Sequence, residues 1–526
     1  MKTSSTRRAA ERGTPESNGT AARPAPDARD DIIVSPDQHI VNDQAEKALA
    51  GDPEVYQRAG ELVAVVSDGE RKRIVPLTIN SIRDRLARNA RFISRHKSKH
   101  SEERKRLHPP SWCGGALLDR GEYRHIRRLA GLVDHPVLRP NGSILEEPGY
   151  DAATGLIYTP AGPVGAVPQH PTKADAVDAA RELLSAVADF PFARPMHQSA
   201  WLAALLTPLA RFAFDGPAPL FLADANARGV GKGLLFQVIA HILSGKPFPV
   251  SSYTDDESEF RKHITSVARG GDRFVLLDNV EGKFGNSTLD RALTATTWED
   301  RLLGQNKKVS FPLAATWYAT GNNLSLAADT ARRICQIRLE CGDEHPELRK
   351  GFAHPELLSW VKSERPRLLR AALTILAAYC HAGRPDQDLS PWGSFEGWSG
   401  WVRAAVKWAG QSDPGETRQF LRDQSDLVHQ NMCLLLRRWQ ELDRDGKGLT
   451  VGEVIDRVTP GPNGSPSATL NDMRAAIEHL CGKVDAVKLG QLLAGKKRRN
   501  FGGLFIDRAG KEHNAVRWVV KPQDEF

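Results

Sequence analysis

One stretch of the sequence decides the fold: Leu220-Phe-Leu-Ala-Asp-Ala-Asn-Ala-Arg-Gly-Val-Gly-Lys-Gly-Leu-Leu235. Its apolar start, Leu220 to Ala223, predicts a short buried strand that runs directly into a glycine-rich turn and then a helix. Backbone N–H groups of such a turn and of the helix N-terminus point at one place, where they attract an anion. Lys232 adds a positive charge at that place. The pattern therefore predicts a phosphate-binding loop.

The loop departs in two places from the motif G-x-x-x-x-G-K-S/T. Asn226 stands at the first glycine position, and Gly233 replaces the hydroxyl that would help to hold Mg²⁺. A plain glycine-rich turn is the alternative if this stretch is taken alone. The candidate nucleotide-binding residues are Asn226, Gly229, Val230, Gly231, Lys232, Gly233 and Leu234.

Two further predicted strands end in polar side chains that suit the same site. Residues 273–278 end in Asp278, a carboxylate placed to hold Mg²⁺, although strands that end in a helix-capping Asp are also common. Residues 314–322 end in Asn322, an amide placed to orient the attacking water or to sense the γ-phosphate. Asn279 occupies the position of the usual water-activating acid, and Glu281 is the nearby substitute.

A pair of arginines, Arg332 and Arg333, precedes the strand predicted over residues 334–339. One interpretation of the pair is a solvated helix end. The other is an arginine finger, which reaches the nucleotide of a neighbouring subunit and stabilises the charge on the transferred phosphoryl group.

The order of these motifs resembles the compact AAA+ core of superfamily 3 helicases. More narrowly, it resembles the ATPase or primase-helicase proteins of phages, plasmids and integrated elements. The stretches similar to that group are residues 255–262, 298–304 and 319–323, and the similarity extends over about residues 45–526.

The resemblance implies ATP and Mg²⁺ as cofactors and a ring-shaped homohexamer as the assembly. It implies Lys232 as the phosphate lysine, Asp278 as the Mg²⁺ carboxylate and Asn322 as the sensor. Arg332 or Arg333 would be the finger. Gly233 departs from the family pattern, so a water molecule or a hydroxyl from elsewhere would have to replace that metal ligand.

DNA contacts are predicted at two places. In superfamily 3 rings a hairpin before the sensor strand lines the pore, and residues 304–312 stand at that position with Lys307 and Lys308 near the tip. The C-terminal region has three predicted short helices and a β-hairpin, which is the layout of a winged helix. Its basic run consists of Lys496, Lys497, Arg498 and Arg499. A small packing domain with an exposed basic loop is the alternative there.

The fold class expected is an α/β AAA+-type core with a P-loop, together with an α+β N-terminal domain, a helical region and a C-terminal winged-helix-like domain. The expected divisions are a disordered tail over 1–36, the N-terminal domain over 37–170, the ATPase core with its preceding helices over 171–345, the helical region over 346–440 and the winged-helix-like domain over 441–526. The tail prediction rests on a segment that has almost nothing to bury.

Composition limits the classes of partner. The 526 residues include 72 Lys and Arg against 64 Asp and Glu, a net charge of +8 that permits a nucleic-acid partner without establishing one. The six scattered cysteines form no C-x-x-C pair, which argues against a disulfide scaffold or a zinc ribbon and suits a reducing cytoplasm. No apolar run approaches the roughly 18–20 residues of a membrane span. A cytoplasmic protein without a membrane partner is expected.

Two other conspicuous patterns have structural interpretations. The basic run over residues 95–106 is typical of a solvated charged face. The aromatic cluster of Trp392, Phe395, Trp398, Trp401 and Trp408 has near-helical spacing, which favours a packed helical core over a base-stacking surface.

Together these features predict an ATP-dependent DNA helicase or replication ATPase of mobile-element type, which hydrolyses ATP at the subunit interfaces of a ring to translocate on or unwind DNA. Single-stranded DNA is expected in the pore and a duplex origin at the C-terminal domain. No predicted strand before residue 200 carries Asp-x-Asp, so a separate chain is expected to supply any primase. Two alternatives stay open: an origin-binding initiator that uses ATP as an assembly switch, and a non-catalytic DNA-binding protein with a degenerate nucleotide site.

Overall fold

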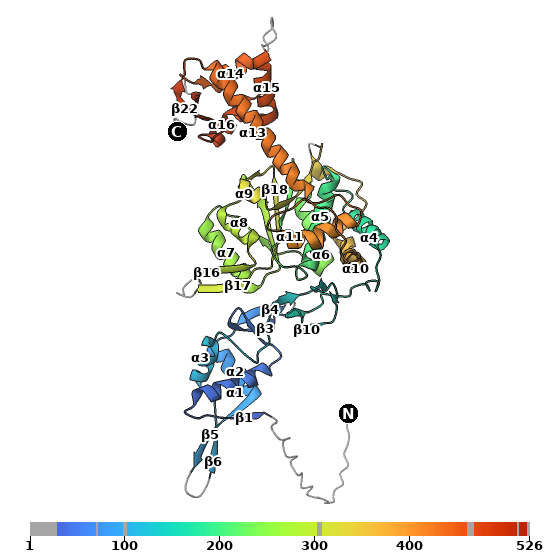
Figure 1. Cartoon of the computed structure of the whole chain (residues 1–526), viewed down its shortest axis with the longest axis vertical. Helices are drawn as coiled ribbons and strands as arrows, with labels where there is room; N and C mark the ends of the chain where they lie inside the picture. Colours follow the sequence, from blue (N-terminus) through green and yellow to red (C-terminus); the bar gives the residue numbers. More distant parts are fainter. Residues whose placement is uncertain are drawn as a thin grey trace, which may run out of the picture. The chain divides into compact units, whose positions relative to one another are not determined.

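The chain divides after residue 129 into two units, residues 1–129 and 130–526 (Figure 1). The computed structural model describes residues 29–69, 72–97, 102–301, 308–343, 345–459, 468–512 and 515–522. Two of the expected divisions, the tail over 1–36 and the N-terminal domain over 37–170, differ from these units. A strand forms within the expected tail over 1–36, and residues 130–170 of the expected N-terminal domain belong to the second unit. The reason is strand pairing, which a composition shift does not reveal.

The described residues of the first unit form two three-stranded sheets and three helices. Its elements are β1 (Asp30–Ile33), α1 (Gln38–Ala50), β2 (Val55–Arg58), β3 (Glu61–Ser67), β4 (Lys72–Pro76), α2 (Ile79–Asn89), β5 (Ala90–Lys97), β6 (Glu102–Leu107) and α3 (Ser111–Asp119). The strand orders are β1-β5-β6 and β2-β3-β4. Ile32, Leu49, Leu62, Leu86 and Phe92 belong to one buried apolar core that joins the helices to both sheets.

A five-stranded sheet is the centre of the second unit. In spatial order it consists of β13 (Val250–Ser251), β14 (Phe274–Val280), β18 (Thr316–Asn322), β12 (Leu220–Ala225) and β20 (Ile334–Leu339), and every neighbouring pair is parallel. Parallel sheets are covered on both faces, which explains why β12 is buried along its whole length and is apolar except for Asp224. The predicted α/β core with a largely parallel sheet is confirmed.

Helices cover the two faces of this sheet with separate apolar cores. On one face, Phe221 and Ala223 of β12 pack with α4 (Lys173–Ser185), α5 (Pro195–Ala210), α6 (Lys232–Ser244) and α10 (Leu357–His381). On the other, Leu220 and Leu222 pack with α7 (Glu257–Gly270) and α8 (Ser287–Thr294). Successive residues of β12 thus point to opposite cores, as expected for a strand, whose side chains alternate between the two faces of the sheet.

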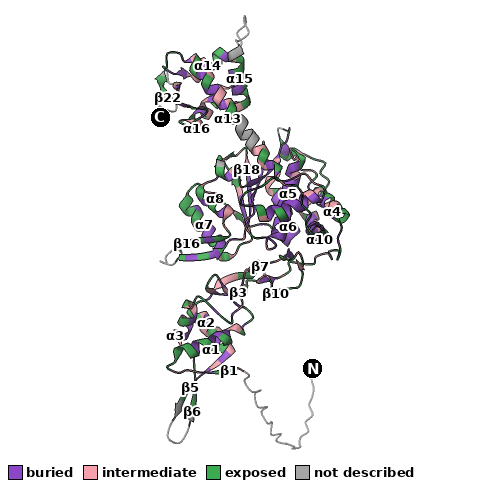
Figure 2. Ribbon diagram, in the orientation of Figure 1, coloured by how far each residue is buried: buried purple, intermediate pink, exposed green. Residues whose placement is uncertain are grey.

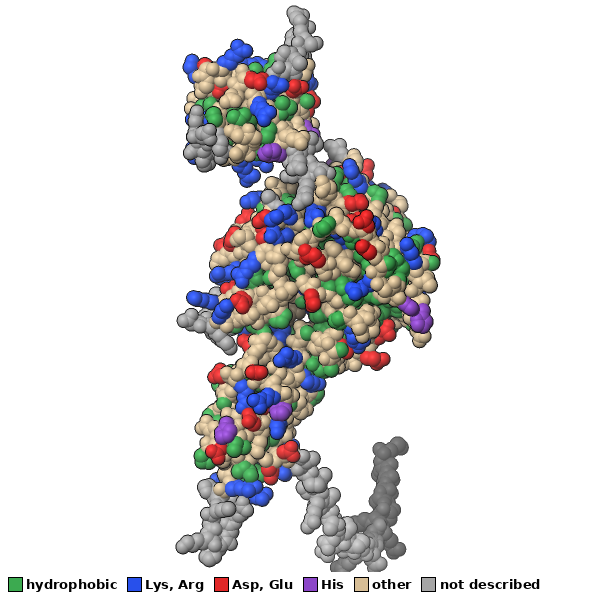
Figure 3. All heavy atoms as spheres, in the orientation of Figure 1, with side chains coloured by type: hydrophobic (Ala, Val, Ile, Leu, Met, Phe, Trp, Pro, Cys, Tyr) green, Lys and Arg blue, Asp and Glu red, His purple; other side chains and the backbone are tan. Residues whose placement is uncertain are grey.

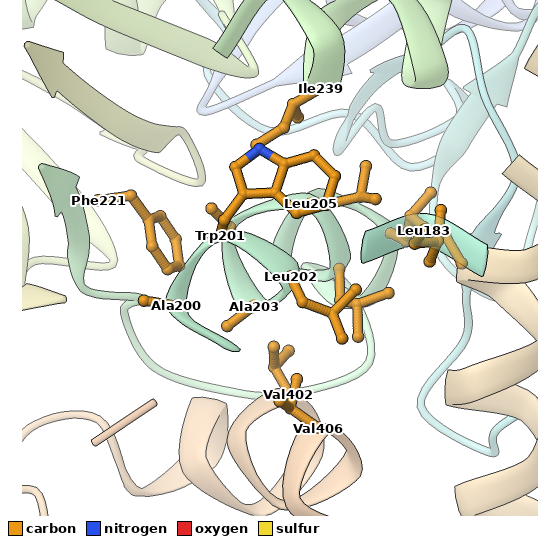
Figure 4. Packing of buried hydrophobic residues seen from close by; sticks show 14 of the residues in the cluster. Leu183, Ala200, Trp201, Leu202, Ala203, Leu205, Phe221, Ile239, Val402 and Val406 are labelled. Carbon is orange, nitrogen blue, oxygen red and sulfur yellow. The ribbon is translucent and has the colours of Figure 1, made fainter. Parts of the chain in front are cut away.

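Helix α5 shows why the first face is so well packed. It is apolar all round and buried along nearly its whole length, as Figure 2 shows for α5 and α6. Trp201 lies among Leu183, Leu205, Phe221 and Ile239 in Figure 4, and its indole Nε1 donates a hydrogen bond to the carbonyl of Leu235 at 3.2 Å. This bond ties α5 to the first turn of α6, which follows the glycine-rich loop after β12.

Short elements complete the second unit around the sheet. They are β7 (Gly131–Val133), β8 (Val137–Leu138), β9 (Ile144–Leu145), β10 (Gly149–Asp151), β11 (Leu156–Tyr158), β15 (Lys283–Phe284), β16 (Thr297–Arg301), β17 (Lys308–Pro312), β19 (Ser325–Leu326), α9 (Ala328–Ala331), a 3₁₀ turn (Pro346–Leu348), α11 (Glu396–Trp398), a π-helical turn (Ser399–Arg403) and α12 (Ala404–Trp408). The tryptophans at 392, 398, 401 and 408 are buried in the same core as α5. Their predicted packing role is confirmed.

The C-terminal region has its own apolar core. It contains α13 (Glu416–Leu442), β21 (Leu449–Thr450), α14 (Val451–Val458), α15 (Ala468–Cys481), α16 (Ala486–Lys496), β22 (Leu504–Glu512) and β23 (Ala515–Pro522). The strands form an antiparallel sheet in the order β21-β23-β22. The indole of Trp439 donates to the carbonyl of Trp518 at 3.1 Å, which fixes α13 against the sheet. Within the described ranges, no helix combines the length and apolar character that a bilayer crossing requires.

Candidate functional site

The loop between β12 and α6 has the geometry of an anion-binding turn. Gly229 and Gly231 have φ angles of 76° and 92°, in the left-handed region that glycine adopts without a steric penalty. A side chain at Gly231 would also meet the ring of Phe190, because an added Cβ would lie 3.0 Å from Phe190 Cε1. Helix α6 begins at Lys232, so its unpaired N–H groups and the loop face the same region.

Asn226 has a structural role at the position where the motif has glycine. Its side-chain Nδ2 donates to the Cys341 carbonyl at 2.8 Å, and its Oδ1 accepts from the Cys341 backbone N–H at 3.0 Å. These two bonds fasten the start of the loop to the segment that follows β20. The departure from the motif is therefore compatible with an ordered loop.

Lys232 reaches the end of a neighbouring strand. Its Nζ donates a hydrogen bond to Asn322 Oδ1 at 2.7 Å, although ninety positions separate the two residues in the chain. Burial lowers the pKa of Lys232, while the negative charges of Asp224 and Asp278 act in the opposite direction. A partly buried cation beside two carboxylates is a position at which an anionic ligand would compensate the cost of desolvation.

Asp278 is aimed by a bulge in β14. The register between β14 and β18 shifts between Leu277 and Val280, so two residues of β14 lie opposite Thr320. The Asn279 backbone N–H donates to Thr320 Oγ1 at 2.8 Å, and the same hydroxyl donates to Asp278 Oδ1 at 2.5 Å. Asn279 has a φ of 52°, a left-handed conformation that Asn tolerates better than most residues. Bulges commonly re-aim side chains next to functional sites.

The region between Gly233 and Asp278 fits a magnesium ion. A Cβ added at Gly233 would lie 4.0 Å from Asp278 Oδ1, so the position that usually carries a hydroxyl ligand faces the carboxylate. Mg²⁺ in nucleotide sites is typically held by one or two carboxylates together with substrate phosphates and water. The residues present fit that arrangement, with one protein ligand fewer than the motif provides.

An ion pair that the sequence did not suggest lies beside the loop. Asp224 and Arg338 are cross-strand neighbours in β12 and β20, and Arg338 NH1 donates to Asp224 Oδ2 at 2.5 Å. Arg338 NH2 also donates to Asn323 Oδ1 at 2.9 Å. Burial raises the pKa of Asp224, and the Arg338 charge opposes that shift. The sequence did contain a signal for this ion pair: an acidic residue and a basic residue, each within a mostly apolar strand.

Glu281 lies in the turn after β14 and is exposed. Its Oε1 is 3.5 Å from NH2 of Arg228 in the phosphate loop, and both side chains are largely open to solvent. The structure thus brings Glu281 to the same side of the sheet as the loop. Its salt bridge with Arg228 links the two turns across the site.

Arg332 and Arg333 lie at the opposite edge of the sheet. They precede β20, whose first residue pairs with Leu220 at the start of β12, whereas the phosphate loop follows Ala225 at the end of β12. Five residue steps along a strand correspond to about 17 Å. Neither arginine is therefore near the loop of its own chain.

The two arginines differ in exposure. The Arg332 side chain is 57% exposed and contacts Asp329. The Arg333 side chain is 20% exposed, with NH1 donating to the Asp329 carbonyl at 2.5 Å and lying 3.4 Å from Asp290 Oδ1. Arg333 is thus held against its own chain, and Arg332 is the more available of the two.

Lys308 begins β17 in the hairpin that precedes β18. It is 70% exposed and lies 2.7 Å from Glu299 Oε2. A cavity of about 580 Å³ adjoins the hairpin and is lined by Arg261, Arg291, Glu299, Asp300, Arg301 and Lys308. Cations outnumber anions in this lining. Lys307 lies outside the described residues.

The C-terminal basic run is partly neutralised. Arg498 Nε and Lys497 Nζ both contact Asp507, at 2.7 Å and 3.2 Å. Burial acts to raise the pKa of Asp507, but hydrogen bonds from Arg498, the Arg508 backbone and Lys497 outweigh it and lower the pKa to about 2. Lys496, whose pKa burial lowers, and the exposed Arg499 complete the run.

Solved structures similar to this chain are those of helicases. No protein-family model matches the sequence, and neither does any curated protein. The structure titled "SCCmec type IV Cch - active helicase" has a TM-score of 0.31 and 12% identity, over 90% of this chain and 93% of that one. A JCV helicase structure has a TM-score of 0.21 and 14% identity, over 46% of this chain and 68% of that one. Similarities this weak do not bear on the activity of this chain.

Proposed function

We propose that this protein is an ATP-dependent DNA helicase or replication ATPase of the superfamily 3, mobile-element type. The observation that carries the proposal is the convergence of Lys232, Asp278 and Asn322 at one edge of the parallel sheet. Each comes from the carboxyl end of a different strand or from the loop after it, and crevices outside these ends are where open α/β sheets bind ligands.

The roles follow from the chemistry of each group. The loop amides and Lys232 bind the phosphates, and Asp278 holds Mg²⁺. The metal would supply positive charge that neutralises the phosphate oxygens. Asn322 and the exposed carboxylate of Glu281 orient the attacking water. Support for one shared site comes from the Lys232–Asn322 hydrogen bond and from Thr320, which orients Asp278.

The arginine finger comes from a second copy of the chain, in a homohexameric ring. Arg332 is the preferred finger because its side chain is exposed and lies at the edge of the sheet away from its own phosphate loop. In a head-to-tail ring, that edge of one subunit faces the nucleotide edge of the next. A finger stabilises charge on the transferred phosphoryl group, typically by a factor of about 10³–10⁵ in rate.

We propose DNA as the polymer that the protein binds and moves along. Lys307, Lys308 and the basic cavity beside the hairpin would bind the backbone of a single strand in the pore, with a steep salt dependence. The C-terminal domain, as a winged-helix-like module, would bind a duplex origin, with Lys496 and Arg499 as the basic residues of its run that Asp507 does not engage.

The deciding experiment is ATP hydrolysis with and without single-stranded DNA, on the wild-type chain and on Lys232→Ala, with native mass recorded for both. We expect DNA-stimulated hydrolysis by the wild type and none by the variant, with assembly retained. A strand-displacement assay then separates a helicase, which unwinds, from an initiator that uses ATP only to assemble. DNA binding without Mg²⁺-dependent hydrolysis would instead identify a degenerate nucleotide site.

A further inference from the structure

The sheet β1-β5-β6 of the first unit has two faces of opposite character. Its inner face carries Ile32 and Phe92, which are buried in the core with α1, α2 and α3. Residues paired across neighbouring strands share a face, and side chains alternate along each strand. The pairings Asp31 with Arg91, Ile93 with Arg106 and Arg95 with Arg104 therefore place one set of side chains on the outer face. Among the residues whose side chains the structure describes, that set consists of Asp31, Ile33, Arg91, Ile93, Arg95, Arg104 and Arg106, with Ile93 buried and the charged residues around it.

The outer face concentrates like charges. Arg95 and Arg104 lie directly opposite one another, an arrangement that destabilises an isolated strand pair. Asp31 is the acid of this face on β1. It is 2.7 Å from Arg91 and 4.0 Å from Arg104, so one carboxylate lies between two guanidinium groups. Arg91 and Arg104 thus share this carboxylate, and the 56% exposed Arg104 faces solvent.

The position of this charge in the fold is also distinctive. β5 and β6 form an antiparallel ribbon that extends beyond the three helices of the unit (Figure 1). Lys and Arg side chains gather where the described part of the ribbon ends (Figure 3). A basic run in solution would be a flexible, solvated face. Here Arg95, Arg104 and Arg106 lie at strand spacing on two paired strands.

We propose that the outer face of β1-β5-β6, through Arg95, Arg104 and Arg106, binds the phosphate backbone of duplex nucleic acid. This site is separate from the nucleotide site and does not depend on ATP hydrolysis. A two-stranded β-ribbon fits the major groove of a duplex, and backbone contacts to the groove walls need cations on one face of such a ribbon.

The chemistry favours phosphate over the carboxylates of an acidic protein. Arginines two residues apart on a strand are spaced by about 6.7 Å, a regular repeat that suits successive phosphates of one strand. The guanidinium group binds phosphate oxygens with two parallel N–H donors, and its weak hydration lowers the cost of that contact.

The test uses the full-length chain without nucleotide and a fluorescent duplex, with binding followed by anisotropy at several salt concentrations. The variant is Arg95→Gln/Arg104→Gln/Arg106→Gln. Its charge-matched control is Lys72→Gln/Arg73→Gln/Arg88→Gln, which removes three exposed cations from other surfaces of the same unit. The single variant Arg104→Gln covers the case in which the triple variant fails to fold.

We expect the triple variant to bind the duplex about 10-fold more weakly or worse, and the control to bind within about 2-fold of the wild type. The slope of log K against log salt should fall by about 0.9 for each lost contact, hence by about 0.9 in Arg104→Gln. Basal ATP hydrolysis should be unchanged in the triple variant, so this result is independent of the proposed function.

Three results would overturn the proposal. The control could lose as much affinity as the triple variant, which would indicate that duplex binding depends on the net charge of the unit and not on this face. The triple variant could lose single-strand binding while duplex binding is kept. Polyglutamate could displace the duplex from the wild type as effectively as unlabelled duplex does, which would indicate a generic polyanion surface.

Discussion

The two edges of the central sheet differ in what their polar side chains do. At the carboxyl edge, Lys232, Asp278 and Asn322 come from distant parts of the sequence and are joined by hydrogen bonds to one another or to Thr320. At the opposite edge, the side chains of Arg332 and Arg333 contact Asp329 and Asp290 of α9 and α8. One edge resembles a site, and the other resembles an ordinary surface.

From this difference we learn that the proposed site needs two chains. Because of the direction of the strands, one chain would supply the phosphate loop and a second chain the arginine. All strands of the sheet are parallel, so every loop that follows a strand lies at one edge and every residue that precedes a strand lies at the other. An arginine before β20 therefore cannot serve the loop after β12 in the same molecule. If it takes part in hydrolysis, it does so in a neighbour.

Arg332→Ala tests this division with the largest expected effect. We expect hydrolysis to fall by about 10³–10⁵-fold while nucleotide binding is kept, because a finger acts on the transition state. Mixing Arg332→Ala with Lys232→Ala, each inactive alone, should restore part of the activity, since each supplies what the other lacks. Arg333→Ala is the matched control, and we expect it to lower the melting temperature more than the hydrolysis rate. A mixture as inactive as its components would contradict the division between chains.

Thr320→Val tests whether the Thr320 hydroxyl orients Asp278 at the carboxyl edge of the sheet. The hydroxyl holds both Asn279 and Asp278, and hydrogen bonds to charged groups are worth about 1.5–3 kcal/mol, so hydrolysis should fall by about 10- to 100-fold. The control is Thr316→Val on the same strand, whose buried Oγ1 has no hydrogen-bond partner among the described residues. We expect that control to keep full activity. Equal losses in the two variants would mean that Thr320 contributes packing only.

Gly233→Ser asks whether the missing hydroxyl weakens metal binding. The space at Gly233 admits a side chain at ordinary contact distance from Asp278, so the serine hydroxyl should add a metal ligand. The Mg²⁺ concentration for half-maximal hydrolysis should then fall several-fold, whereas Gly233→Ala should leave it unchanged or raise it. An unchanged Mg²⁺ requirement in Gly233→Ser would place the metal away from this position.

Asp507→Asn should have the smallest effect and should not alter hydrolysis. The folded-state pKa of Asp507 is lowered to about 2, below its usual value of about 3.9, so its ion pairs stabilise the fold above pH 4 and cease to do so as the pH falls towards 2. Urea unfolding should show the wild type to be more stable than the variant at neutral pH. The difference should disappear towards pH 2, and a constant difference would contradict the assignment.

The sequence predicted the elements that depend on local patterns. The apolar runs before the glycine-rich loop and before Asp278 are strands β12 and β14, and the helices expected before the core are α4 and α5. The near-helical spacing of the tryptophans correctly indicated a core. In each case the pattern reports burial of one segment, and burial against a sheet or helix is what hydrophobic periodicity encodes.

What the sequence did not predict depends on pairing between distant segments. The bulge that aims Asp278 requires Thr320 on a partner strand, and the Asp224–Arg338 pair requires the register of β12 with β20. The charged run over residues 95–106 has no apolar alternation, yet it includes most of β6 and the end of β5, because these strands pair with each other and β5 pairs with β1. Register and pairing are tertiary properties, so no local pattern could supply them.

The most direct test of the central claim is calorimetric titration of the full-length chain with Mg²⁺ and a non-hydrolysable ATP analogue. The wild type should bind the analogue, and Lys232→Ala should lose about 10- to 100-fold in affinity because a charge-assisted hydrogen bond to phosphate is removed. Lys362→Ala, which removes an exposed lysine of α10, should bind like the wild type. Equal affinities of Lys232→Ala and the wild type would contradict the claim that this edge of the sheet holds a nucleotide.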